Sequence, residues 1–316
     1  MGEMLLEGGY GVGGIYLANK SVLSMYGGGR TTGVCVDSGE DMTYIVPCWE
    51  GTPLPDATLI LRLGGKQVTD RLLHLLSNGK YSFSDDTFLL WKRGGRSKAG
   101  SRLTVASRRD VVREAKERFC RVSPVALAKA AAGGARICKD EEEEVLRLPD
   151  GNIVVVGEEA YSAPELMFCP EMGNKKSSPT AAPPAKTGGL AELVYQSVMR
   201  CEERRRPRLL SNIMLTGGNS LLPGLNQRLQ SELRAMLQKA AGGAKKAAVV
   251  RVQAQEGREN FTWDGGAHLC SLSSFQRLWL TKQDYMETGA TLNVQTGKMY
   301  GEELQQQPPP EVVKSC

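Results

Sequence analysis

The sequence predicts an α/β fold, in which strands and helices follow one another along the chain. Two patterns lead to this class. Arg30 to Gly51 contains two strand-like runs joined by a tight polar turn, as in a β-hairpin. Asn212 to Thr216 is a short apolar run that passes through two glycines into an amphipathic helix over Leu225–Leu237. A strand, a glycine turn and a helix in succession let backbone approach a ligand, because no Cβ stands in the way.

The hairpin is the first candidate site. Thr31 to Asp37 is small and β-branched, and Met42 to Pro47 alternates polar and apolar residues with the period of a half-buried strand. Between them, Gly39 allows dihedrals in which successive N–H groups point the same way. The turn is therefore able to cradle a phosphate with help from the Ser38 hydroxyl, while Asp37 would hold a metal through water. An ordinary hairpin is the alternative, because short motifs match by accident.

The remaining elements follow from apolar spacing and from helix breakers. Predicted helices cover Ile15–Tyr26, Gly65–Lys80, Asp110–Val122 and Leu190–Arg200, and predicted strands cover Leu54–Leu63, Asn152–Val156 and Val249–Gln253. Gly9 to Gly14 has the spacing of a dinucleotide fingerprint but no clear strand before it, so a flexible lead-in is expected. The basic stretch Cys201–Arg208 is interpreted as a charged helix end stopped by Pro207, with a nucleic-acid patch as the alternative.

The composition is that of an ordinary globular protein. Charged residues make up 24% of the chain and the formal net charge is +5, which does not indicate a concentrated basic face for nucleic acid. Eight cysteines without a CxxC pair, and two histidines, argue against a zinc site and fit a reducing compartment. No apolar run reaches membrane-spanning length and the N-terminus lacks the features of a signal peptide. A soluble, cytoplasmic or cytoskeletal protein is therefore expected, with the nucleus as the alternative.

Five stretches carry a family resemblance. LSMYGGGRTTGVCVDSGEDMTYIVPCWEG, which begins at Leu23, resembles the actin-family segment that carries the second phosphate-binding hairpin. Four others resemble actin segments in actin's order: Arg113–Val122, Leu148–Phe168, Ile213–Leu229 and Trp263–Gly289. The resemblance implies an actin-like α/β fold of the actin and sugar-kinase type, mainly the larger lobe, with most of the small lobe missing.

The resemblance also implies a division of the chain. The parts are a glycine-rich lead-in with an inter-lobe helix at 1–26, a subdomain-three-like part at 27–63 and 186–256, a subdomain-four-like part at 64–185, a remnant of subdomain one at 257–292, and an extended tail at 293–316. Low complexity predicts insertions at 84–109, 126–144 and 170–189. Three explanations of the reduced small lobe stay open: an incomplete gene product, completion by another polypeptide, or retention of the larger lobe as a scaffold.

The resemblance further implies a nucleotide site. In actins, the helix that matches Asp110–Val122 brackets the adenosine, and the glycine turn that follows the strand at 212–216 lies against the nucleotide. The matching helix residues, Arg113, Lys116 and Glu117, are spaced to share one helix face. The implied cofactor is ATP or ADP with Mg²⁺, held by residues of the hairpin, the helix and the turn: Asp37 (also the metal, through water), Ser38, Gly39, Glu40, Arg113, Lys116, Glu117, Gly217, Gly218, Asn219, Leu221 and Leu222.

Several positions depart from the family pattern. Lys20 matches the glutamine that orients the attacking water, and a lysine has no acceptor with which to hold that water. Tyr44 matches the catalytic histidine, and no first phosphate loop of the DNGSG type occurs. Glu40 and Asp41, in place of Asp-Gly, add a side chain and charge at the hairpin tip. Because positioning is most of phosphoryl-transfer catalysis, ATP hydrolysis is not expected.

These residues imply a structural subunit of a cytoskeletal or other multiprotein assembly, with weak, static or absent ATP binding. Its partners would be other protein subunits, but not a membrane, and nucleic acid only through a complex. The alternative is a functional actin that binds and hydrolyses ATP and polymerises into filaments. The Asp37-Ser38-Gly39 run and the Gly217-Gly218 pair keep nucleotide binding open.

Overall fold

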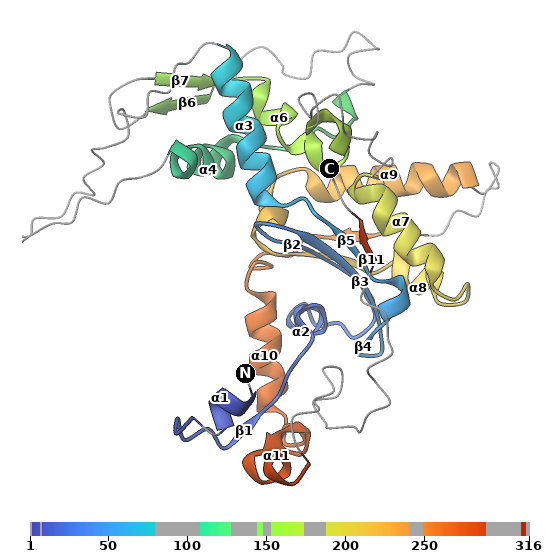
Figure 1. Ribbon diagram of the computed structural model, residues 1–316. Coiled ribbons are helices and arrows are strands. Elements are labelled where there is room, and N and C mark those ends of the chain that lie inside the picture. Colours follow the sequence, from blue (N-terminus) through green and yellow to red (C-terminus); the bar gives the residue numbers. More distant parts are fainter. Residues whose placement is uncertain are drawn as a thin grey trace, which may run out of the picture.

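The computed structural model describes residues 2–6, 8–79, 108–127, 144–147, 153–173, 188–240, 249–288 and 311–313. Within these residues, a central sheet carries helices on both faces (Figure 1), which confirms the α/β class. The predicted insertions lie largely outside the described residues, as does the predicted tail apart from 311–313.

The central sheet has seven strands, in the order β11-β5-β3-β2-β8-β9, with β4 paired to β3. These strands are β2 (Gly33–Ser38), β3 (Thr43–Trp49), β4 (Thr52–Pro53), β5 (Leu59–Leu61), β8 (Ile213–Thr216), β9 (Val252–Gln253) and β11 (Glu311–Val313). β3 runs antiparallel to β2 and β5, whereas β2, β8 and β9 are parallel. Parallel strands finish at the same edge of a sheet, so Asp37 at the end of β2 pairs with Thr216 at the end of β8.

Strand β2 is buried along its whole length, because both faces of the sheet are covered. Val34 and Val36 belong to a large cluster of buried side chains, and Cys35 between them belongs to a smaller cluster with Met214 and Phe261. This division follows from the alternation of side chains along a strand.

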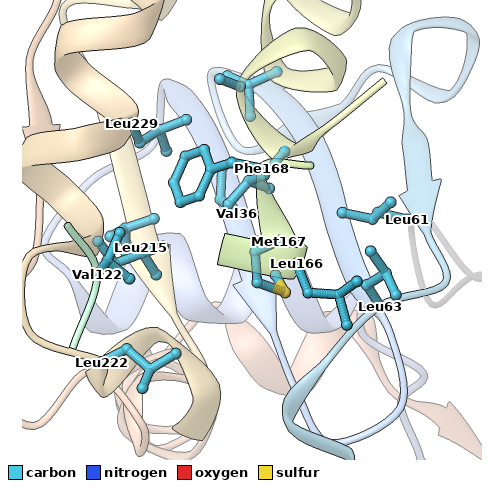
Figure 2. Close-up of a cluster of buried hydrophobic side chains, with 14 of the residues drawn as sticks. Val36, Leu61, Leu63, Val122, Leu166, Met167, Phe168, Leu215, Leu222 and Leu229 are labelled. Carbon is cyan, nitrogen blue, oxygen red and sulfur yellow. The ribbon is translucent and has the colours of Figure 1, made fainter. Parts of the chain in front are cut away.

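Different helices cover the two faces. The large cluster includes side chains of α7 (Leu190–Arg200), α9 (Leu225–Ala240) and the short helix η3 (Pro164–Met167), and the smaller one includes side chains of α2 (Lys20–Gly27) and α10 (Phe261–Ser271). Figure 2 shows sheet residues of the large cluster, such as Val36, meeting Leu229 of α9 and Phe168.

The other elements lie toward the two ends of the sheet (Figure 1). At the upper end are α3 (Gly65–Gly79), α4 (Arg108–Phe119), α6 (Glu159–Ser162) and the hairpin of β6 (Glu144–Arg147) with β7 (Ile153–Val156). Of these, α3, α4 and α6 add buried side chains to the large cluster. At the lower end are α1 (Gly2–Leu6), β1 (Gly14–Ile15), β10 (Leu280–Thr281) and α11 (Lys282–Thr288). The remaining short helices are η1 (Pro55–Ala57), η4 (Pro170–Gly173), α8 (Arg206–Leu210), η5 (Gly218–Leu221) and η6 (Phe275–Leu278). Among the described helices, none is long and apolar enough to cross a membrane.

The predicted helices are present, but some of their ends are shifted. The helix predicted from Ile15 was wrong over its first residues, because α2 begins at Lys20. Asn19 is its N-cap: the side-chain oxygen accepts hydrogen bonds from the amides of Ser21 at 2.9 Å and Val22 at 3.4 Å. The strand predicted for Leu54–Leu63 is also shorter, because residues 55–57 form η1 and only β5 pairs with the sheet.

The basic stretch at Cys201–Arg208 stabilises the end of a helix. Arg206 donates hydrogen bonds to the carbonyl oxygens of Met199 at 2.8 Å and Cys201 at 2.9 Å, where α7 ends. The Arg205 guanidinium lies 5.3 Å from the centre of the Trp49 ring, a cation–π contact. These contacts support the interpretation as a charged helix end. The predicted stop at Pro207 was wrong, because α7 ends at Arg200 and Pro207 lies in the first turn of α8.

A buried ion pair anchors α9 to η3. Arg228 and Glu165 are each only 1% exposed, and the guanidinium binds both carboxylate oxygens, at 2.8 and 3.1 Å. Arg228 also donates to the Ser123 carbonyl at 2.9 Å and lies 4.7 Å from the centre of the Phe168 ring. A buried ion pair is compatible with a stable fold only while both charges are paired. The loss of one partner leaves an uncompensated charge in the core.

We therefore predict that Arg228→Met lowers the free energy of unfolding by about 3–5 kcal/mol, because the Glu165 carboxylate is left buried without its cation. Urea unfolding followed by circular dichroism measures this change. The matched control is Arg204→Met, which removes an exposed pair with Glu202 and should cost less than about 1 kcal/mol. Equal losses in the two variants would contradict the importance of the buried pair.

Helices α2 and α10 approach so closely that glycines are required between them. A Cβ on Gly265 would overlap the Leu23 carbonyl oxygen, and a Cβ on Gly27 would overlap the Phe261 carbonyl oxygen. At the adjacent Gly266, by contrast, the nearest atom to an added Cβ is a Leu23 methyl carbon at 3.9 Å. Two neighbouring glycines in one helix therefore differ in the space around them.

This difference predicts opposite effects of the same substitution. Gly265→Ala should destabilise the protein by about 1–3 kcal/mol, because the two helix backbones must move apart. Gly266→Ala should be neutral or stabilising by up to about 1 kcal/mol, since alanine favours a helix over glycine. Thermal and urea unfolding of both variants provide the measurement, and a Gly265→Ala variant as stable as Gly266→Ala would disprove the close approach.

Candidate functional site

The site begins at the β2–β3 hairpin, where Ser38 pairs with Thr43 and a four-residue turn follows. The Gly39 N–H donates to the Met42 carbonyl at 3.1 Å and closes this turn. Gly39 is not among the described glycines with positive φ. The Gly39 amide thus serves the hairpin itself, and the alignment of N–H groups toward a phosphate stays a prediction.

The carbonyl groups of the same turn receive the start of α3. The N–H of Gly65 donates to the Gly39 carbonyl at 2.9 Å, and that of Lys66 donates to the Glu40 carbonyl at 2.7 Å. The first amides of a helix have no partner within the helix, so this docking satisfies them. At the tip of the turn, the amides of Glu40 and Asp41 donate to no described residue and remain free to contact a ligand.

A chain of hydrogen bonds occupies the Ser38 hydroxyl. Thr43 Oγ1 donates to the Leu63 carbonyl at 2.7 Å, so the 2.8 Å contact between the two hydroxyls requires Ser38 to donate to Thr43. Asn219 Nδ2 in turn donates to Ser38 Oγ at 2.9 Å. A hydroxyl has one proton, and that of Ser38 is used within the fold. Ser38 is 0% exposed and its hydroxyl is bonded within the fold, and its contact with a phosphate stays a prediction.

The glycine turn after β8 lies directly against the hairpin. Gly217 has a φ of 84°, and a Cβ there would lie 2.6 Å from Asp37 Oδ1 and still closer to the Ser38 carbonyl oxygen. Glycine is therefore required both by conformation and by space. Leu221 is 44% exposed, whereas Leu222 is 7% exposed and belongs to the large cluster, which places Leu222 in the core.

Arg258 holds this turn in place, a role that the sequence did not reveal. Its guanidinium donates to Ser220 Oγ at 3.1 Å, to the Ser220 carbonyl at 3.0 Å and to the Gln255 carbonyl at 2.9 Å. Thr216 Oγ1 donates to the Arg258 carbonyl at 2.8 Å.

Helix α4 separates the three residues that were expected to act together. Lys116 is buried and its Nζ donates to the Gly65 carbonyl at 3.2 Å. Burial lowers the pKa of Lys116, and the Glu40 carboxylate is the largest opposing influence. Arg113 and Glu117 are exposed, and Arg113 pairs with Asp110 at 3.3 Å. Only Lys116 therefore lies at the hairpin, packed against the start of α3.

The most consequential contact joins α2 to the end of β2. Lys20 Nζ lies 2.7 Å from Asp37 Oδ2, and the Asp37 side chain is 2% exposed. Neither carboxylate oxygen of Asp37 accepts a hydrogen bond from a described residue. Tyr44 is 39% exposed, and its hydroxyl contacts Met42 Sδ at 3.7 Å. Lys20 and Tyr44, which replace the family's two water-positioning residues, thus contact Asp37 and Met42.

These contacts do not fit a magnesium site at Asp37. The ammonium of Lys20 already occupies the approach to one oxygen, and it carries the charge that a cation would supply there. Within the described parts of the chain, no group of three or more His, Cys, Asp or Glu side chains is placed to hold a metal ion. The site therefore combines a hairpin turn closed by Gly39, a glycine required at position 217 and a cation, Lys20, that the chain itself supplies.

The hydroxyl chain yields a testable prediction. Ser38→Ala removes the acceptor of Asn219 and the donor to Thr43, and it should lower the free energy of unfolding by about 1–3 kcal/mol. Ser271→Ala, at an exposed hydroxyl that bonds within α10, is the control and should change stability by about 0.5 kcal/mol or less. Equilibrium unfolding in urea compares the two, and a Ser38→Ala variant that matches the control would refute the assigned chain.

Comparison with known proteins adds independent findings. A family model described as Actin matches residues 1–297. A protein named putative actin-29, from Dictyostelium discoideum, is 30% identical over 277 residues, which are 88% of this chain and 62% of that protein. The chain thus spans less than two thirds of the length of this curated relative.

Proposed function

Because this chain belongs to the actin family, we propose that it is a structural subunit of a cytoskeletal or other multiprotein assembly, with weak, static or absent ATP binding. The family match and the mixed sheet with helices on both faces support an actin-like fold. Proteins of this family typically bind nucleotide with Mg²⁺. What this chain does with the site depends on its own residues.

The observation that carries the proposal is the ion pair between Lys20 and Asp37. A lysine whose ammonium is held by a carboxylate offers no acceptor to an attacking water, and an ammonium cannot act as a base while it is charged. Tyr44, the other substituted position, contacts Met42 instead of the interior of the site. Phosphoryl transfer requires a positioned water, so these contacts argue against turnover.

The remaining polar groups support weak binding. Ser38 and the Gly39 amide are bonded within the fold, which leaves the tip amides of Glu40 and Asp41 as the hairpin's backbone donors. The carboxylates of these same two residues would repel a phosphate. Gly217 lets the turn lie directly against the hairpin, and Gly218 next to it has open space around it, which favours retained contact with a nucleotide.

The segment from α10 to α11 supports protein partners. Trp263 is 81% exposed, and Trp279, 43% exposed, lies 5.7 Å from Phe275 between ring centres; large exposed apolar side chains are typical of interaction surfaces. Trp279 also lines an apolar pocket of about 280 Å³ together with Tyr16, Leu269 and Phe275. A cytoplasmic or cytoskeletal assembly, the usual setting of the family, is the proposed location of such contacts.

We predict that the purified chain releases phosphate from Mg-ATP at least about a hundredfold more slowly than a conventional actin assayed in parallel, because both water-positioning side chains are replaced. A coupled phosphate-release assay measures the rate, and sedimentation measures assembly with and without Mg-ATP. Hydrolysis at the rate of the control, together with ATP-dependent filaments, would favour the alternative of a functional ATP-hydrolysing actin.

A further inference from the structure

The carboxylate of Asp37 is a buried charge that needs compensation. Its side chain is 2% exposed, and neither oxygen accepts a hydrogen bond from the described residues. A buried carboxylate is tolerated only when it is paired with a cation or fully hydrogen-bonded. The Lys20 ammonium, 2.7 Å from Oδ2, supplies that cation from the protein itself.

Helix preference does not explain the presence of Lys20. It is the first residue of α2, where the partial positive charge of the helix end disfavours a cation. The first turn of α2 contains no acidic residue that would offset this effect. The pairing with Asp37 therefore accounts for a lysine at this position.

Lys20 keeps donors for a ligand. An ammonium has three N–H groups, and that of Lys20 is paired with Asp37 by charge at 2.7 Å. The Lys20 side chain is 59% exposed, so its N–H groups are accessible from solvent. The other donors that the hairpin offers are the amides of Glu40 and Asp41, which donate to no described residue. A hydrated divalent ion, by contrast, would have to displace the ammonium from Asp37.

We propose that Lys20 is a tethered cation that replaces the divalent metal at Asp37, so that the polyphosphate group of a nucleotide binds this hairpin directly and without magnesium. The inference rests on the proposed function, because it treats the nucleotide as a static ligand. A single positive charge compensates a polyphosphate less than a divalent ion does, which accounts for weak affinity.

The experiment measures ATP binding to the full chain by isothermal titration calorimetry, with magnesium and with excess chelator. For the wild-type chain, we expect Kd values that agree within about threefold in the two conditions. Lys20→Gln should weaken binding in chelator by about tenfold or more, because a charge-assisted contact is lost. The same variant should bind more tightly when magnesium is added.

Two further variants distinguish the effect of the positive charge at position 20 from the effect of removing any exposed lysine. Lys20→Arg keeps the positive charge and should remain independent of magnesium. Lys239→Gln removes an exposed lysine at the end of α9 and should leave both Kd values unchanged. Circular dichroism of every variant shows that it is folded.

Wild-type binding that is at least about tenfold tighter with magnesium would overturn the inference. Absence of binding in both conditions would also overturn it, while the structural role, which needs no ligand, would stand. Magnesium-dependent binding with ATP turnover would overturn both proposals. The wild-type comparison decides between these outcomes even if Lys20→Gln fails to fold.

Discussion

The buried carboxylate of Asp37 is the constraint on which the arrangement of the site depends. It lies at the end of β2, where the neighbouring turn can pass only because residue 217 is a glycine. Its charge is compensated by Lys20, so the start of α2 must stay close to the end of β2. α2 is in turn held by α10, whose Gly265 allows the two helix backbones to touch. The buried charge of Asp37 thus links the sheet to α2 and α10, the helices that cover one of its faces.

The polar groups of the hairpin show how a ligand-binding shape can be retained while its donors are used elsewhere. The Gly39 and Ser38 donors bond to Met42 and Thr43, and the turn's carbonyls receive the first amides of α3. The bonds of Ser38, Thr43 and Gly65 satisfy groups of buried residues, which stabilises the fold. The same bonds remove donors from a phosphate. The hairpin is therefore better suited to hold the start of α3 than to bind a charged ligand tightly.

Much of the fold could be predicted, because its signals are local. The period of two in the hairpin and the apolar stripe of α9 are readable over a few residues, and both elements are present. Errors occurred where a local signal was ambiguous. Residues before Lys20 have apolar spacing that suits a helix, but the Asn19 cap starts the helix later. The resemblance assigns Leu222 to the nucleotide, which stays a prediction, and the structure shows that its apolar side chain is buried in the core.

By itself, the sequence determined the α/β class, the family and the two departures, Lys20 and Tyr44, that argue against hydrolysis. Only the tertiary structure decided what those residues contact. Lys20 meets Asp37 across two elements, and Asn219 reaches Ser38 from 181 residues away. Arg228 is paired with Glu165 across 63 residues. Side-chain partners so far apart leave no periodic signal in a single sequence, because the distance between them is set by the packing of the whole sheet and its helices.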